Sequence, residues 1–96
     1  MNSIDIFTMI TSFADITSVQ SGYGFVDVYA TMKYKPKTAQ LVALKEGRVS
    51  IYYASENDKF DIDKSLVSIA SNGTNDDAKG KKIIVTFKKE SEADNG

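Results

Sequence analysis

The chain has 96 residues, of which 42% are hydrophobic and 26% charged, and its formal net charge is −1. This length fits one domain, and the composition is that of an ordinary globular protein. Histidine and cysteine are both absent, which excludes disulfides, thiolate chemistry, histidine-based catalysis and most zinc sites. We therefore expect a protein that is not an enzyme and that holds no metal or cofactor.

The sequence shows no signal for secretion or for a membrane. The first residues lack a basic segment ahead of an apolar one. No apolar run approaches the roughly 18 residues that a membrane-spanning helix needs. We expect a cytoplasmic protein with no membrane partner.

Apolar residues recur with helical spacing near the N-terminus, and this pattern predicts one amphipathic helix from Ser3 to about Asp15. Ser3 can cap the helix, and Asp5 suits the positive end of its dipole. The small and polar residues of the segment 17–24 then mark the exit from the helix. The apolar positions of the helix are Ile6, Met9, Ile10 and Phe13.

The segment from Tyr23 to Tyr34 alternates between two sets of side chains, which predicts a long strand. Pro36 ends this strand, because proline has no amide hydrogen for a ladder. The set predicted for the core is Val26, Val28, Ala30, Met32 and Tyr34. The set on the other face is Tyr23, Phe25, Asp27, Tyr29, Thr31 and Lys33.

The rest of the chain is predicted to be strands and turns. The segments 39–45 and 48–55 form a hairpin around Glu46-Gly47, and 60–70 forms two short strands with a bend at 63–65. The segment 72–80 is a polar loop, and 81–89 is a strand with Ile83, Val85 and Phe87 on one face. Residues 90–96 form a disordered acidic tail.

These elements predict an α+β fold that is mainly β, with a single globular domain over residues 1–89. The N-terminal helix packs on a five- or six-stranded, mostly antiparallel sheet, which is either bent or closed into a small barrel. The helix needs the sheet, because its apolar stripe is stabilised only when it is buried.

Aromatic rings beside lysines distinguish the outward face of the predicted strand at 23–34. Rings stack on unpaired bases and lysines neutralise phosphates, so this combination is typical of surfaces that bind single-stranded nucleic acid. The alternative is that the rings pack under the helix and that the lysines protect a strand edge from aggregation. The candidate binding residues are Tyr23, Phe25, Tyr29, Lys33, Lys35 and Lys37.

Arg48 and Tyr53 form a second candidate surface, because tyrosine and arginine are enriched at protein interfaces. The alternative is a solvated strand face without a partner. A carboxylate pair on one face of a strand, Asp61 and Asp63, is compatible with glycoside chemistry but is ordinarily a solvated face. The acidic loop at 72–77 lacks the spacing of a calcium-binding loop.

We therefore interpret the chain as a small non-catalytic binding module that acts through protein–protein interaction, as a regulator, an inhibitor or an assembly factor. The alternative interpretation is a single-stranded nucleic-acid-binding domain that uses the aromatic and lysine-rich strand face. Pairing of a strand edge with a second copy of the chain is left open as a route to a homo-oligomer.

Overall fold

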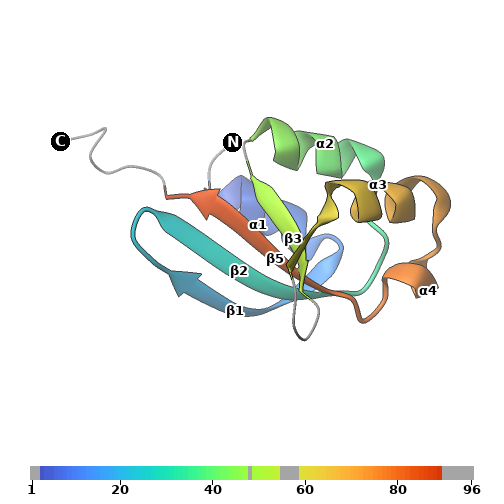
Figure 1. The fold of residues 1–96 in the computed structure, drawn as a ribbon, viewed down its shortest axis with the longest axis horizontal. Helices are drawn as coiled ribbons and strands as arrows, with labels where there is room; N and C mark the ends of the chain where they lie inside the picture. The colour runs from blue at the N-terminus through green and yellow to red at the C-terminus, as the bar shows by residue number, and fades with distance from the viewer. Residues whose placement is uncertain (1–2, 48, 55–58, 90–96) are drawn as a thin grey trace.

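The computed structural model describes residues 3–47, 49–54 and 59–89 (Figure 1). Arg48 and the predicted acidic tail at 90–96 lie outside these residues. The elements, in chain order, are α1 (Ser3–Thr11), β1 (Ala14–Ser21), β2 (Phe25–Met32), α2 (Thr38–Glu46), β3 (Ser50–Ala54), β4 (Lys59–Asp61), α3 (Ile62–Asn72), α4 (Asn75–Ala78) and β5 (Lys82–Lys88).

The strands form one open antiparallel sheet in the order β1-β2-β5-β3-β4. β1, β2, β5 and β3 make up the body of the sheet, and the three-residue β4 pairs along the outer side of β3. The prediction of an α+β fold with an N-terminal helix on an antiparallel sheet is confirmed. The predicted count of five or six strands is not confirmed, because four strands form the body of the sheet and β4 has only three residues. The described strands form an open sheet with edges at β1 and β4, so the barrel alternative is wrong.

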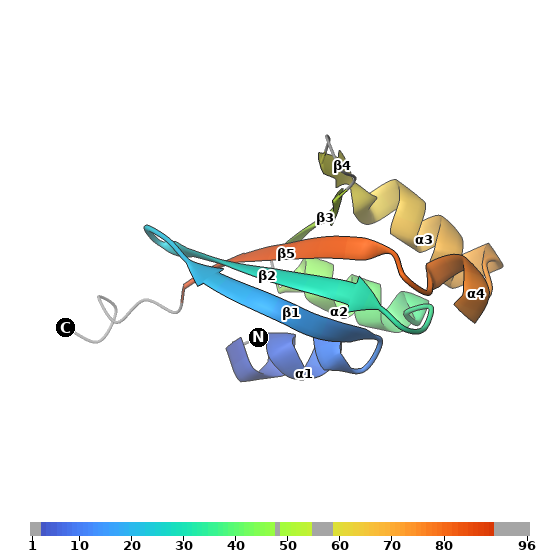
Figure 2. The same cartoon turned by 90° about the horizontal axis from the view of Figure 1, so that it is seen from below.

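The core lies between the sheet and its helices, which pack on one face. It contains aliphatic side chains from α1, α2 and α3 against the inward positions of β2 and β5. In Figure 2 the strands β1, β2 and β5 lie in front of α2, and no described helix crosses them on the viewer's side. We call that uncovered side the open face. The most deeply buried core side chains include Ile10, Phe13, Val28, Met32, Leu44, Leu66, Ile83 and Val85.

The alternation in β2 and β5 was predicted correctly. Val28, Ala30 and Met32 are buried in β2, and Ile83, Val85 and Phe87 are buried in β5. The register places Val28 opposite Val85 and Ala30 opposite Ile83, so both sets face the same core. Tyr34 was assigned to the core and this was wrong, because it follows the end of β2 and is 52% exposed.

The predicted strand at 39–45 is the helix α2. Leu41 and Leu44 are three residues apart, and both are buried on the side of the helix that faces the core. The Lys37 amide donates a hydrogen bond to Gln40 Oε1 at 2.8 Å, which stabilises the start of the helix. Glu46-Gly47 is therefore the end of a helix and not a hairpin turn, and the Gly47 amide donates to the Ala43 carbonyl.

The prediction of two short strands at 60–70 is also wrong for most of these residues. β4 covers only Lys59–Asp61, and α3 begins directly after it at Ile62. Leu66 and Ala70 are both buried, at a spacing of four residues that is helical. The polar loop predicted at 72–80 contains the short helix α4, with Thr74 as its N-cap.

Near the N-terminus, α1 ends at Thr11 and β1 occupies residues that were predicted to be helix and loop. Of the described strands β1 pairs with β2 alone, and it has mostly exposed side chains, so it lacks the alternation that identifies a half-buried strand. Phe13 and Ala14 are buried at the junction between the two elements. The Phe13 carbonyl accepts the amides of Lys33 and Tyr34, which fixes the end of β2 beside this junction.

Candidate binding surfaces

The open face carries the outward set of β2 beside the outward set of β5. The register pairs Phe25 with Lys88 and Thr31 with Lys82, which brings lysines of β5 next to the aromatic side of β2. Thr86 Oγ1 donates a 2.7 Å hydrogen bond to Asp27 Oδ1 across this face. Phe25 and Lys88 are therefore neighbours at one end of the open face, and Thr31 and Lys82 are neighbours at the other end.

Ile84 lies at the centre of the open face but is only 3% exposed. Its register partners are Tyr29 in β2 and Tyr52 in β3. Tyr29 is half-buried, so these two side chains expose little apolar surface in the middle of the face. Among the β2 and β5 side chains, the exposed ones lie toward the two ends of the face.

One end of the sheet is the turn between β1 and β2, which extends beyond α1 in Figure 2. Three apolar side chains are exposed here: Tyr23 fully, Phe25 at 54% and Val19 at 48%. We call these three residues the aromatic tip. The register places Val19 opposite Val28, on the side of the helices, whereas Phe25 belongs to the open face. The tip therefore presents apolar groups on both sides of the hairpin.

The turn of the aromatic tip is held in place by the neighbouring strand. The Gly22 amide donates to the Phe25 carbonyl at 2.9 Å, and the Lys89 amide donates to the Gly24 carbonyl at 2.9 Å. Gly24 has a φ of 82°, a conformation that residues with a side chain rarely adopt. The tip is thus ordered by hydrogen bonds before any partner binds.

The opposite end of the sheet is rich in lysine. The Met32 amide donates to the Lys81 carbonyl at 2.7 Å, and the Gly80 amide donates to the Met32 carbonyl at 2.8 Å. The Lys35 amide donates to Asn75 Oδ1 at 3.1 Å. These bonds join the residues after β2 to those before β5. We call the resulting cluster the lysine end; its members are Lys33, Lys35, Lys79, Lys81 and Lys82.

The sequence grouped Tyr23, Phe25 and Tyr29 with Lys33, Lys35 and Lys37, and the structure separates these residues. Tyr23 lies in the turn before β2 and Lys33 follows its last residue, so they are separated by the eight residues of the strand, a length of roughly 26 Å at about 3.3 Å per residue. Tyr23 and Phe25 are not packed under the helix, and Tyr29 is half-buried. Lys35 and Lys37 are exposed in and after the connection to α2. The single surface predicted from the sequence is therefore divided between the aromatic tip and the lysine end.

The second predicted surface consists of Arg48, which lies outside the described residues, and of Tyr53, whose side chain also lies outside them. The backbone register places Tyr53 opposite Ile83 of β5 and Phe60 of β4. The role of Arg48 and Tyr53 in binding a protein stays a prediction.

The predicted carboxylate pair does not share a strand. Asp61 ends β4, whereas Asp63 belongs to α3. In the acidic segment, Asp77 Oδ2 accepts the Thr74 amide at 2.8 Å and so caps α4. Within the described residues, no group of three or more acidic side chains is placed to hold a metal ion.

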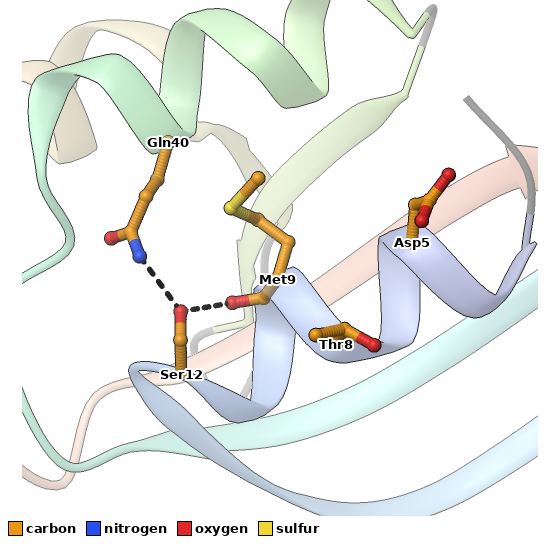
Figure 3. Close-up of a pocket in the computed structure, with 5 residues that line it drawn as sticks. All are labelled: Asp5, Thr8, Met9, Ser12 and Gln40. Atoms are coloured by element: carbon orange, nitrogen blue, oxygen red, sulfur yellow. Dashed lines mark hydrogen bonds between the residues drawn. The ribbon is translucent and has the colours of Figure 1, made fainter.

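A shallow hollow of about 500 Å³ lies between α1 and α2, lined by Asp5, Thr8, Met9, Ser12 and Gln40 (Figure 3). Gln40 reaches from α2 and donates a hydrogen bond from Nε2 to Ser12 Oγ at 2.9 Å. Ser12 Oγ in turn donates to the Met9 carbonyl. These contacts connect the two helices, and we interpret them as structural.

Gln40→Ala tests this interpretation. We expect it to lower the free energy of unfolding by about 1–2 kcal/mol, because it removes the bond to Ser12 and the acceptor for the Lys37 amide. Urea denaturation gives the difference. Gln20→Ala, on the exposed part of β1, is the control, and equal stability of the two variants would contradict the structural role.

Comparison of the chain with protein-family models, with curated proteins and with solved structures finds no match. Among the described residues, no helix is both long and apolar enough to cross a membrane.

Proposed function

We propose that the protein is a non-catalytic binding module that docks a protein partner through the aromatic tip. The observation that supports this is the exposure of Tyr23 and Phe25 at the end of a hairpin that projects past the helices. Rings of this kind dominate the energetics of protein interfaces. A partner that covers them removes a large apolar area from water.

The surroundings of the tip resemble the arrangement of a small interface. The apolar centre is formed by Tyr23, Phe25 and Val19, and the exposed lysines Lys88 and Lys89 lie beside it at the end of β5. Interfaces commonly combine an apolar centre with a polar rim. The hydrogen bonds from Gly22 and Lys89 order the turn in advance, which reduces the entropy lost on binding.

β1 is the edge strand beside the tip, and among the described strands it pairs with β2 alone. The register shifts between Ile16 and Ser18, and Thr17 Oγ1 donates to the Tyr29 carbonyl at 3.1 Å. Such an irregularity discourages uncontrolled edge pairing. Pairing of this edge with a second copy stays a prediction.

The proposal predicts that Tyr23→Ser weakens binding by about 2–3 kcal/mol, or roughly 30- to 150-fold in Kd. The partner is isolated on the immobilised wild-type protein and purified, and its Kd is measured by calorimetry. Because Tyr23 is fully exposed, the thermal unfolding of the variant should match that of the wild type.

Val42→Ser is the matched control. Val42 is 47% exposed on α2, away from the hairpin, so its loss removes apolar surface without touching the tip. We expect a Kd within about two-fold of the wild type. A partner that tolerates Tyr23→Ser, or that is lost on Val42→Ser, would reject the tip as the docking surface.

A further inference from the structure

We propose that the lysine end binds single-stranded nucleic acid, with one base in a hollow beside Tyr34 and the adjoining phosphates on the surrounding lysines. This inference does not depend on the aromatic tip, which lies at the other end of the sheet. The site contains Lys33 and Lys35, which belong to the segment after β2 that the sequence identified. The pairing of β2 with β5 brings the lysines before β5 beside them.

The charge of this end differs from that of the whole chain. Five lysines from two distant segments gather here, although the net charge of the protein is −1. All of them except the half-buried Lys33 are exposed. The acidic side chains nearby are Asp15, which pairs with Lys33 at 3.2 Å, Asp76, and Asp77, which caps α4. Five lysines against three aspartates leave this end with a net positive charge, so an anionic ligand meets a local positive field.

A hollow of about 540 Å³ opens at this end. This volume falls within the range of about 300–1,000 Å³ that is usual for small-ligand sites. It is lined by Asp15, Thr31, Met32, Lys33, Tyr34, Asn75, Asp76, Lys79 and Gly80. Tyr34 is 52% exposed, so one part of its ring is available for stacking. Lys33 Nζ lies 5.7 Å from the ring centroid.

The combination of groups selects the ligand. Lysines alone suit any polyanion, but an exposed ring in a hollow between them suits an unpaired base. Asp76 in the hollow repels phosphate but can accept a hydrogen bond from the exocyclic amino group of a base. The phosphates then contact the exposed Lys35, Lys81 and Lys82. Cytosine carries such an amino group and thymine does not, so cytosine is favoured.

The test uses fluorescence anisotropy with labelled DNA single strands about 12 nucleotides long, one all-cytosine and one all-thymine. At roughly 50 mM salt and neutral pH, the wild type binds the cytosine strand about five-fold or more tightly than the thymine strand. The affinity falls as the salt concentration rises. Lys35→Ala and Lys81→Ala each weaken binding about five- to ten-fold, and each reduces the slope of log K against log salt concentration by about 0.7.

Two further pairs of variants test the site itself. Tyr34→Ala weakens binding at least about five-fold, whereas Tyr34→Phe keeps the ring and binds like the wild type. Asp76→Ala brings the affinities for the cytosine and thymine strands close together. Two variants serve as controls and leave binding unchanged. Lys64→Ala removes an exposed lysine of α3, and Tyr23→Ser changes the aromatic tip.

Two results would overturn the proposal. One is no binding of either strand at roughly 50 mM salt. The other is equal binding of a duplex of the same length, which would show a general polyanion surface. Neither result would affect the aromatic tip, because its own test uses Tyr23→Ser.

Discussion

Phe13→Ala is expected to lower the free energy of unfolding by about 3–5 kcal/mol. Phe13 is 1% exposed and lies where α1 ends and β1 begins, within the core cluster. Its removal leaves a cavity between the helix and the sheet, which the neighbouring elements can fill only in part. A domain of this size has a total stability of about 5–15 kcal/mol, so much of it would be lost.

Phe25→Ala provides the matched control for this prediction, because the same side chain is removed from a position that is 54% exposed. We expect a loss of about 1 kcal/mol or less. Both values come from urea denaturation followed by circular dichroism. Similar losses for the two variants would contradict the placement of Phe13 in the core and of Phe25 on the surface.

Ala43→Pro is expected to cost about 3 kcal/mol or more, since proline in a helix interior removes a hydrogen bond and clashes with the preceding turn. Ala43 lies in the second half of α2. Thr38→Pro, at the first position of the same helix, is expected to stay within about 0.5 kcal/mol of the wild type. Lys37 before it is already extended, with φ −79° and ψ 144°, which suits a residue that precedes proline.

The two proline variants distinguish a helix from the strand that the sequence suggested for residues 39–45. The stability of each is measured by thermal unfolding, and helix content by circular dichroism. A helix tolerates proline at its first turn and not in its interior, so the two variants must differ widely. Tolerance of Ala43→Pro would contradict α2.

The strands β2 and β5 were predictable because both are half-buried. One side of each faces the helices, so Val28, Ala30 and Met32 in β2 and Ile83, Val85 and Phe87 in β5 fall on alternate residues. Ile84 interrupts the polar side of β5, because it is apolar and buried on the opposite face. β1 gave no such signal, because most of its side chains face solvent at the edge of the sheet. A strand that is identified only by its partner cannot be found from its own residues.

The helices α2 and α3 were missed for different reasons. In α2 the apolar residues are almost continuous, and Glu46-Gly47 is compatible with either a turn or a helix end. In α3 the helical spacing of Leu66, Ile69 and Ala70 was present in the sequence. The start of α4 also carried a signal, since Thr74 and Asp77 have the spacing of a capping box.

The candidate surfaces were predictable only where they follow one strand. The alternation in β2 placed Phe25 and Tyr29 together on the outward side, as the structure shows. The approach of Lys79, Lys81 and Lys82 to Lys33 depends on the pairing of β2 with β5, which are separated by about 50 residues. Spacing along the chain carries no information about such a contact.

The position of β5 in the sheet has a consequence for how the protein is made. The last described strand is inserted between β2 and β3, so neither of them has its full set of backbone partners until the ribosome has released residues 82–88. Until then β2 and β3 are exposed edges with apolar side chains, which are prone to associate with other nascent chains. Completion of the sheet therefore depends on a non-local pairing, which is expected to make its folding slow for a domain of this size.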